Sequence, residues 1–305
     1  MRLLLLGDIF ADPDRVRNLL RIIRGEKPDY LVLLGNVVGL ELTSTIRDLH
    51  FQAQCTSAKY GYSHTAATEL LHLGADYFST NIETRSTDGI INYQTYEELM
   101  YYLAGDSVDQ LKTQTLNQLH LFFKLIKEHH PQLNLIMLGG EHEVFPWQDY
   151  IPLNSLKPIS AFPERRGFHM QIADVCHRYG AIYVFGHFIK RFNEDKIIFV
   201  GCEDLYKNRL VPARKLRGFD DQVNIMICNT PPSSGWENFP LAKPTERAWC
   251  LSRSADAIMQ ASGASILFHA HSDQGATNSY FFLGSDDSIL GATQVGYHDG
   301  YILEL

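Results

Sequence analysis

The chain has 305 residues, of which 45% are hydrophobic and 20% charged, and its formal net charge is −8 at pH 7. These values are ordinary for a globular protein, and the acidic balance argues against nucleic acid as a partner. No apolar run approaches the roughly 20 residues that a membrane helix needs, so we expect a cytoplasmic protein without membrane contact. The five cysteines form no Cys-x-x-Cys pair, which predicts neither a disulfide framework nor a zinc ribbon.

The first segment predicts a strand, a helix and a second strand. The apolar runs Leu3–Leu6 and Leu31–Leu34 are typical of strands buried on both faces. Between them, Asp12-Pro13 followed by apolar residues at helical spacing is typical of a capped amphipathic helix. The unit is therefore βαβ, which implies parallel strands joined by a right-handed crossover.

Residues 40–131 form a polar stretch with a mostly helical pattern. Helices are expected near 66–73, 95–103 and 108–129. We interpret the stretch as a largely helical insertion within a single domain that spans residues 1–305. Such an insertion is a natural docking surface for a protein partner.

Strand and helix patterns resume after the insertion. Strands and helices are expected, in chain order, at 135–138, 168–179, 181–185, 196–201, 223–228, 252–262 and 264–268. The last 25 or so residues predict antiparallel strands separated by turns.

Five apolar runs stop at residues that can bind a metal ion. These residues are Asp8, Asn36, Glu141-His142-Glu143, Asn229, and the pair His269 and His271. Each signal alone has an ordinary explanation, because Asp8 can cap a helix, Gly35-Asn36 is a common turn, and one His-x-His pair is not specific. Ligands collect beyond the carboxyl ends of parallel strands, so the ordered combination predicts one shared site.

The order and spacing of these residues resemble the calcineurin-like metallophosphoesterases, whose pattern is Asp-x-His, Gly-Asp, Gly-Asn-His-Asp/Glu, a lone His and Gly-His-x-His. The resemblance runs from Met1 to about Gly275 and implies an α/β fold, a four-layer αββα sandwich. Four key positions match the family, namely Asp8, His142, His269 and His271. Four depart from it, namely Phe10, Asn36, Glu141 and Asn229.

The departures predict a weakened site that holds one divalent cation rather than two. Asn36 is neutral where the family has an aspartate that bridges two cations, and Phe10 cannot bind a metal. The remaining oxygen donors suit Mn²⁺ or Mg²⁺. The metal ligands that the resemblance implies are Asp8, Asn36, Glu141, Asn229, His269 and His271.

Two functions follow from this set. The first is a metal-dependent phosphoesterase, a hydrolase that acts as a phosphatase or phosphodiesterase on a small phosphate ester. In it His142 acts on the leaving oxygen, Glu143 orients His142, and Asp8 orients or activates water. The second is a catalytically inactive relative, a pseudoenzyme that binds a protein partner. An alternative register places the third motif near residues 73–83, with Asn81 as a metal ligand and no catalytic histidine.

Overall fold

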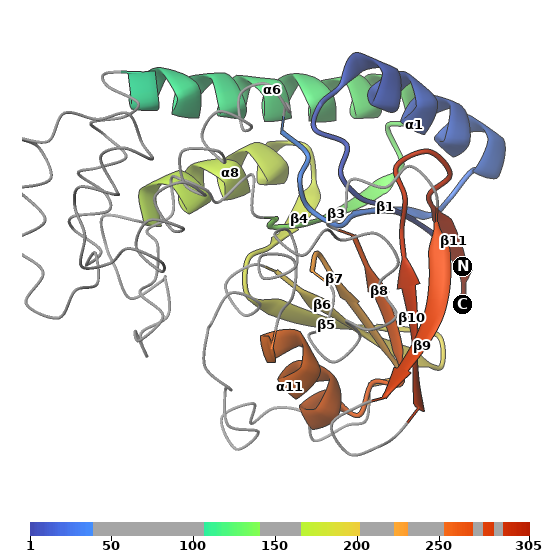
Figure 1. Ribbon diagram of the computed structural model, residues 1–305. Coiled ribbons are helices and arrows are strands. Elements are labelled where there is room, and N and C mark those ends of the chain that lie inside the picture. The colour runs from blue at the N-terminus through green and yellow to red at the C-terminus, as the bar shows by residue number, and fades with distance from the viewer. Residues whose placement is uncertain (39–106, 141–165, 202–222, 231–252, 271–276, 284–288) are drawn as a thin grey trace, which may run out of the picture.

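The computed structural model describes residues 1–38, 107–140, 166–201, 223–230, 253–270, 277–283 and 289–305 (Figure 1). Several predictions lie outside these described residues. They are the helices near 66–73 and 95–103, the register with Asn81, and the site residues Glu141, His142, Glu143 and His271.

One sheet has five strands in the order β11-β1-β2-β3-β4. Their bounds are β1 Arg2–Leu6, β2 Tyr30–Leu33, β3 Asn134–Leu138, β4 Ala181–Val184 and β11 Tyr301–Glu304. Strands β1 to β4 are parallel, and β11 is antiparallel to β1. The predicted βαβ unit is therefore confirmed. Three helices accompany this sheet, namely α1 (Pro13–Glu26), α6 (Ser107–His129) and α8 (Arg166–Arg178).

The second sheet has six strands in the order β5-β6-β7-β8-β10-β9. Their bounds are β5 His187–Phe192, β6 Asp195–Val200, β7 Ile225–Cys228, β8 Ile266–His269, β9 Asn278–Leu283 and β10 Ile289–Gln294. The four inner strands are parallel to one another, and the edge strands β5 and β9 are antiparallel to β6 and β10. Helix α11 (Arg253–Ser262) packs on this sheet.

Three separate hydrophobic clusters show how the layers stack. Successive side chains of a strand point to opposite faces, so Leu4 and Leu6 of β1 face the helices while Leu3 and Leu5 face the second sheet. A third cluster lies between the second sheet and α11. The layers are therefore α1, α6 and α8, then two sheets, then α11 (Figure 1). This arrangement is a mixed α/β sandwich, as the sequence predicts.

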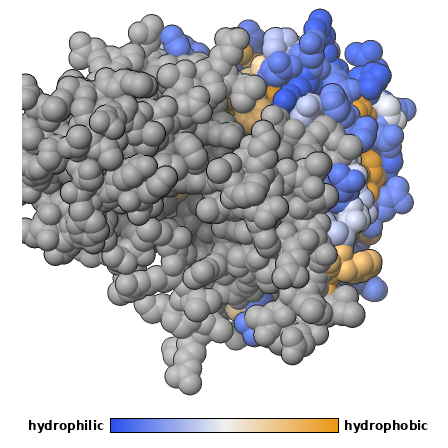
Figure 2. All heavy atoms as spheres, in the orientation of Figure 1, coloured by the Kyte–Doolittle hydropathy of each residue, from blue (hydrophilic) through white to orange (hydrophobic). Residues whose placement is uncertain are grey.

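Helix α1 is capped as expected from Asp12-Pro13. The Asp12 carboxylate accepts hydrogen bonds of 2.9 Å from the backbone N–H groups of Asp14 and Arg15. The helix ends where Lys27 adopts a left-handed φ of 48° and its N–H bonds to the carbonyl of Ile23. Figure 2 shows hydrophilic residues gathered over α1 on the outer surface, as its amphipathic pattern requires.

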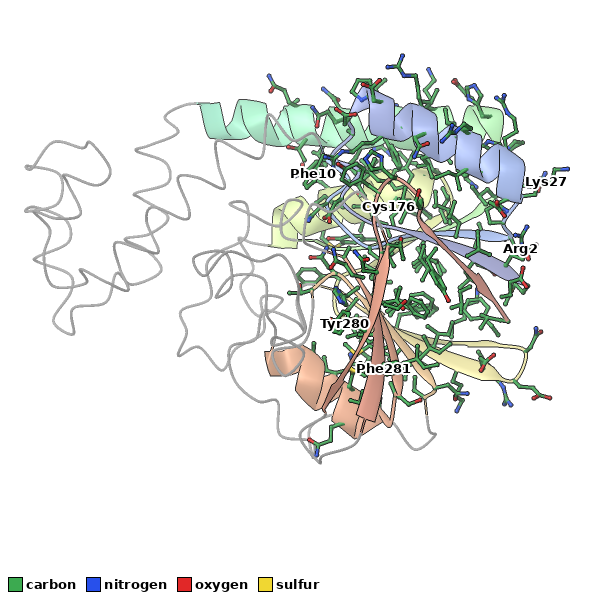
Figure 3. The ribbon with its side chains drawn as sticks, turned by 45° about the vertical axis from the view of Figure 1, so that its right-hand side comes forward. Arg2, Phe10, Lys27, Cys176, Tyr280 and Phe281 are labelled. Atoms are coloured by element: carbon green, nitrogen blue, oxygen red, sulfur yellow. The ribbon has the colours of Figure 1, made fainter. Side chains whose placement is uncertain are left out.

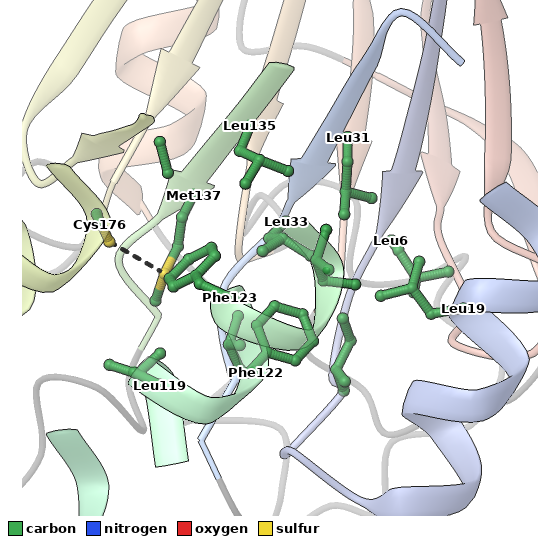
Figure 4. Close-up of a cluster of buried hydrophobic side chains, with 14 of the residues drawn as sticks. Leu6, Leu19, Leu31, Leu33, Leu119, Phe122, Phe123, Leu135, Met137 and Cys176 are labelled. Carbon is green, nitrogen blue, oxygen red and sulfur yellow. Dashed lines mark hydrogen bonds between the residues drawn. The ribbon is translucent and has the colours of Figure 1, made fainter. Parts of the chain in front are cut away.

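The helix predicted at 108–129 is present as α6. Its buried residues Leu119, Phe123 and Ile126 pack in the cluster between the helices and the first sheet (Figure 4). Helix α6, which lies within the stretch 40–131 predicted as a helical insertion, is thus part of the helical layer of the sandwich. None of the helices that the structure describes is long and apolar enough to cross a membrane.

Candidate functional site

Asp8 and Asn36, which follow β1 and β2, form a buried pair. The side-chain amide of Asn36 donates a hydrogen bond of 2.8 Å to the Asp8 carboxylate. Only 3% of Asp8 and 2% of Asn36 are exposed. Both residues have left-handed backbones, with φ of 53° and 54°. The structure therefore brings together two residues that the sequence assigned to one site.

Gly35 marks the point where three strand ends meet. Its φ is +91°, and a Cβ there would lie 2.7 Å from the Cα of Gly140 and 2.8 Å from the Nδ2 of Asn229. Asn229 is fully buried, and its Nδ2 donates a hydrogen bond of 2.6 Å to the Leu34 carbonyl. The ends of β2 and β3 in one sheet thus touch the end of β7 in the other.

The end of β8 lies at the same edge. The backbone N–H of Ala270 donates to the Asn229 carbonyl at 3.0 Å. Ala270 also packs directly against Gly7, where a Cβ would collide with it. The chain at Ala270 therefore approaches the residue that precedes Asp8.

The ring of His269 turns away from this edge. Phe268 and Ala270 face the first sheet, so the pleat places His269 on the opposite face of the second sheet. Its Nδ1 lies 3.1 Å from the Ala270 carbonyl, and its Nε2 lies 2.7 Å from the hydroxyl of Tyr280. Tyr280 lies on β9, where Figure 3 labels it. A neutral ring with its proton on Nδ1 would donate to the Ala270 carbonyl and accept from the Tyr280 hydroxyl at Nε2. Both ring nitrogens are therefore used within the protein.

Phe10 belongs to an aromatic and cationic group that the motifs did not indicate. Its side chain is buried, and the Arg15 guanidinium carbon lies 5.1 Å from its ring centroid. The same carbon lies 3.6 Å from the ring centroid of Tyr297, and Arg15 Nη1 donates to the Asp8 carbonyl. Tyr297 follows β10, so its approach to Arg15 depends on the tertiary fold.

The described residues at this edge offer one carboxylate and two side-chain amides. The Nδ2 atoms of Asn36 and Asn229 are committed to Asp8 and to the Leu34 carbonyl, and the Thr230 hydroxyl lies 3.5 Å from the Oδ1 of Asn229. Asp8 is the one carboxylate in this set, and two closely spaced cations need more negative charge than it supplies. Among the described residues, no group of three or more His, Cys, Asp or Glu side chains could hold a metal ion.

Comparisons with models of protein families and with curated proteins find no match. Solved structures do resemble the chain. One crystal structure is 13% identical at a TM-score of 0.49, with coverage of 97% of this chain and 90% of the other. The protein TT1561 of Thermus thermophilus is 10% identical at 0.42, with coverage of 98% and 90%. The phosphopantetheinyl hydrolase PptH of Mycobacterium tuberculosis is 12% identical at 0.42, with coverage of 97% and 89%. At these TM-scores the likenesses carry no conclusion about activity.

Proposed function

We propose that the protein is a metal-dependent phosphoesterase of the calcineurin-like type, with a site for one Mn²⁺ or Mg²⁺. The close approach of Gly35 to both Gly140 and Asn229 carries this proposal. It joins the ends of three strands beside the buried pair of Asp8 and Asn36. Gly140 directly precedes Glu141-His142-Glu143 in the chain. The proposed ligands Asn36, Glu141 and Asn229 and the proposed acid His142 are therefore at, or within two residues of, the place where Gly35, Gly140 and Asn229 meet.

The cation would be held by oxygen atoms of Asp8, Asn36 and Asn229, together with the carboxylate of Glu141. These are hard donors, which suit Mn²⁺ and Mg²⁺. When bound, such a cation polarises a phosphoryl oxygen. In this proposal His271 is a further ligand. His269 joins the set only if its ring gives up the bond to Tyr280 and turns to the face that meets the first sheet.

The chain's own residues would handle water and protons. Asp8 is held by the amide of Asn36, and its carboxylate can orient water toward a phosphorus atom. His142 would donate a proton to the leaving oxygen, and Glu143 would orient His142. The net charge of −8 favours a small phosphomonoester or phosphodiester over nucleic acid as the substrate.

The second candidate is an inactive scaffold that binds a protein partner. One observation favours it, because the described polar groups already satisfy one another. Asn36 bonds to Asp8, Asn229 bonds to the Leu34 carbonyl, and His269 bonds to Tyr280. A network that is complete without a cation can serve the fold alone. Partner binding through the predicted insertion, residues 40–131, is part of this second proposal, and residues 40–106 of it lie outside the described ones.

An assay of hydrolysis distinguishes the phosphoesterase from the scaffold. Chelator-stripped protein is given bis-p-nitrophenyl phosphate or p-nitrophenyl phosphate, with and without Mn²⁺. We expect Mn²⁺-dependent turnover, which His142→Ala lowers by about 10²–10⁴-fold while Mn²⁺ still binds. Turnover that survives in His142→Ala would remove His142 from the mechanism. Protein that neither binds Mn²⁺ nor hydrolyses either ester would favour the scaffold.

A further inference from the structure

The loop between β1 and α1 contains three non-glycine residues in the left-handed backbone region. They are Asp8, Phe10 and Ala11, with φ of 53°, 54° and 49°. An L-residue in this region is less stable than in the ordinary regions because its Cβ crowds the backbone. Such a run persists only where neighbouring groups hold it, and strained backbone concentrates at functional sites.

Two hydrogen bonds tie this loop to neighbouring elements. The backbone N–H of Phe10 donates to the Asn36 carbonyl at 2.8 Å, which ties the loop to the end of β2. Arg15, in the first turn of α1, donates from Nη1 to the carbonyl of Asp8. The first bond fixes the middle of the loop, and the second fixes the peptide that follows the Asp8 side chain.

The guanidinium of Arg15 is itself fixed by two aromatic rings. Its central carbon lies 3.6 Å from the ring centroid of Tyr297 and 5.1 Å from that of Phe10. A planar guanidinium stacks well on an aromatic ring, and this contact limits its rotation. The segment after β10 is also tied to α1 by a 2.6 Å bond from the Asn18 amide to the His298 carbonyl. The position of Arg15 is thus set by two remote parts of the chain.

We infer that Arg15 is a positioning residue for Asp8. By holding the Asp8 carbonyl, it keeps residues 8–11 left-handed and keeps the Asp8 carboxylate turned toward Asn36. The geometric part of this inference concerns the bond between Asp8 and Asn36 and needs no cation. Its consequence for cation binding rests on the proposed function.

The test compares Arg15→Met with Arg17→Met in the full chain without metal. Arg17 lies half a turn further along α1, is mostly exposed and pairs with Asp14, so it is a matched arginine that does not reach the loop. The readout is the side-chain amide of Asn36 in ¹⁵N–¹H spectra, assigned with Asn36→Ala. We expect Arg15→Met to shift this signal and to raise its hydrogen-exchange rate at least tenfold. Arg17→Met should leave both unchanged.

A second variant tests whether Arg15 acts by holding the backbone of the loop, which we call its bracing role, or only by its charge. Ala11→Gly removes the Cβ penalty at φ 49°, so it should restore the Asn36 signal when added to Arg15→Met. If Arg15 acted only through its charge, glycine at position 11 would restore nothing. That result would overturn the bracing role, and so would an unchanged Asn36 signal in Arg15→Met.

Mn²⁺ binding by electron paramagnetic resonance adds the functional readout. We expect Arg15→Met to weaken Mn²⁺ binding about tenfold and Arg17→Met to leave it unchanged. If no variant and no wild-type protein binds Mn²⁺, the proposed function fails, while the Asn36 signal still decides the inference about Arg15. If Mn²⁺ binds equally well to wild type and to an Arg15→Met protein whose Asn36 signal has shifted, the consequence for cation binding is overturned.

Discussion

Polar side chains lie at both ends of the strands, but they are partly exposed at the amino ends and buried at the carboxyl ends. We call these two ends the two edges of the sheets. At the amino ends, Arg2 pairs with Glu26 at 2.7 Å and Glu304 at 3.3 Å, and these side chains are 36% to 74% exposed. At the carboxyl ends, Asp8, Asn36 and Asn229 are at most 3% exposed. Water can replace a lost partner at the first edge but not at the second. Removing one polar partner should therefore cost little stability at the amino ends and more stability at the carboxyl ends.

The largest loss of stability is expected from a side chain at Gly35, where the ends of β2, β3 and β7 meet. Gly35→Ala places a Cβ 2.7 Å from the backbone of Gly140 at a φ of +91°, and backbone atoms cannot move aside as a side chain can. We expect the free energy of unfolding in urea to fall by about 3–5 kcal/mol.

Gly25→Ala is the matched control for this variant. Gly25 lies in the last turn of α1, and a Cβ there meets nothing within 4 Å. Alanine is the better helix former, so this variant should gain about 0.5–1 kcal/mol. A Gly35→Ala protein as stable as wild type would mean that the ends of β2, β3 and β7 lie further apart.

Two asparagines at opposite ends of β7 test the comparison directly. Asn229 is fully buried and bonds to the Leu34 carbonyl, whereas Asn224 is exposed and bonds to Asp195 at 3.1 Å. Asn229→Ala leaves a buried carbonyl without its donor, so we expect a loss of about 1–3 kcal/mol in the free energy of unfolding. Asn224→Ala should cost less than about 0.5 kcal/mol. Equal losses of unfolding free energy in the two variants would contradict the idea that polar contacts matter more at the carboxyl ends of the strands.

The sequence predicted the elements better than the directions of the side chains. Apolar runs and the Asp12 cap predicted the buried strands and α1 because those signals are local. Strand β5 was missed, since its residues His187–Phe192 are mostly half-exposed and carry no apolar run. A pattern of strand ends places residues at one edge, as with Asp8, Asn36 and Asn229. It does not give the face that each ring takes, and for His269 that face depends on the pleat and on Tyr280, a residue of another strand.

Two tyrosine–histidine pairs provide the next prediction. Tyr280 bonds to His269 at 2.7 Å, and Tyr179 bonds to His120 at 2.9 Å in the helical layer. His269 is fully buried, so Tyr280→Phe leaves its Nε2 without a donor and should lower the free energy of unfolding by about 1–2 kcal/mol.

Tyr179→Phe should cost less, because His120 is only partly buried and water can replace the hydroxyl. Mn²⁺ affinity distinguishes the roles of His269. If His269 is a ligand, freeing its Nε2 should strengthen Mn²⁺ binding in Tyr280→Phe and not in Tyr179→Phe. An unchanged affinity in both variants would take His269 out of the ligand set.

The smallest effect is expected at the exposed edge. Arg2→Met removes the ion pairs with Glu26 and Glu304 and the hydrogen bond from Nη1 of Arg2 to the Glu26 carbonyl. Ion pairs near the surface contribute about 0–1 kcal/mol because water and salt screen them. We therefore expect a loss below about 1 kcal/mol in low salt and almost none in roughly 1 M NaCl. Asn229→Ala, measured alongside, should lose the same free energy at both salt concentrations, because its bond is buried and neutral. A salt-independent loss in Arg2→Met would show that Arg2 acts through its hydrogen bond to the Glu26 carbonyl and not through its ion pairs, and the contrast between the edges would then rest on burial alone.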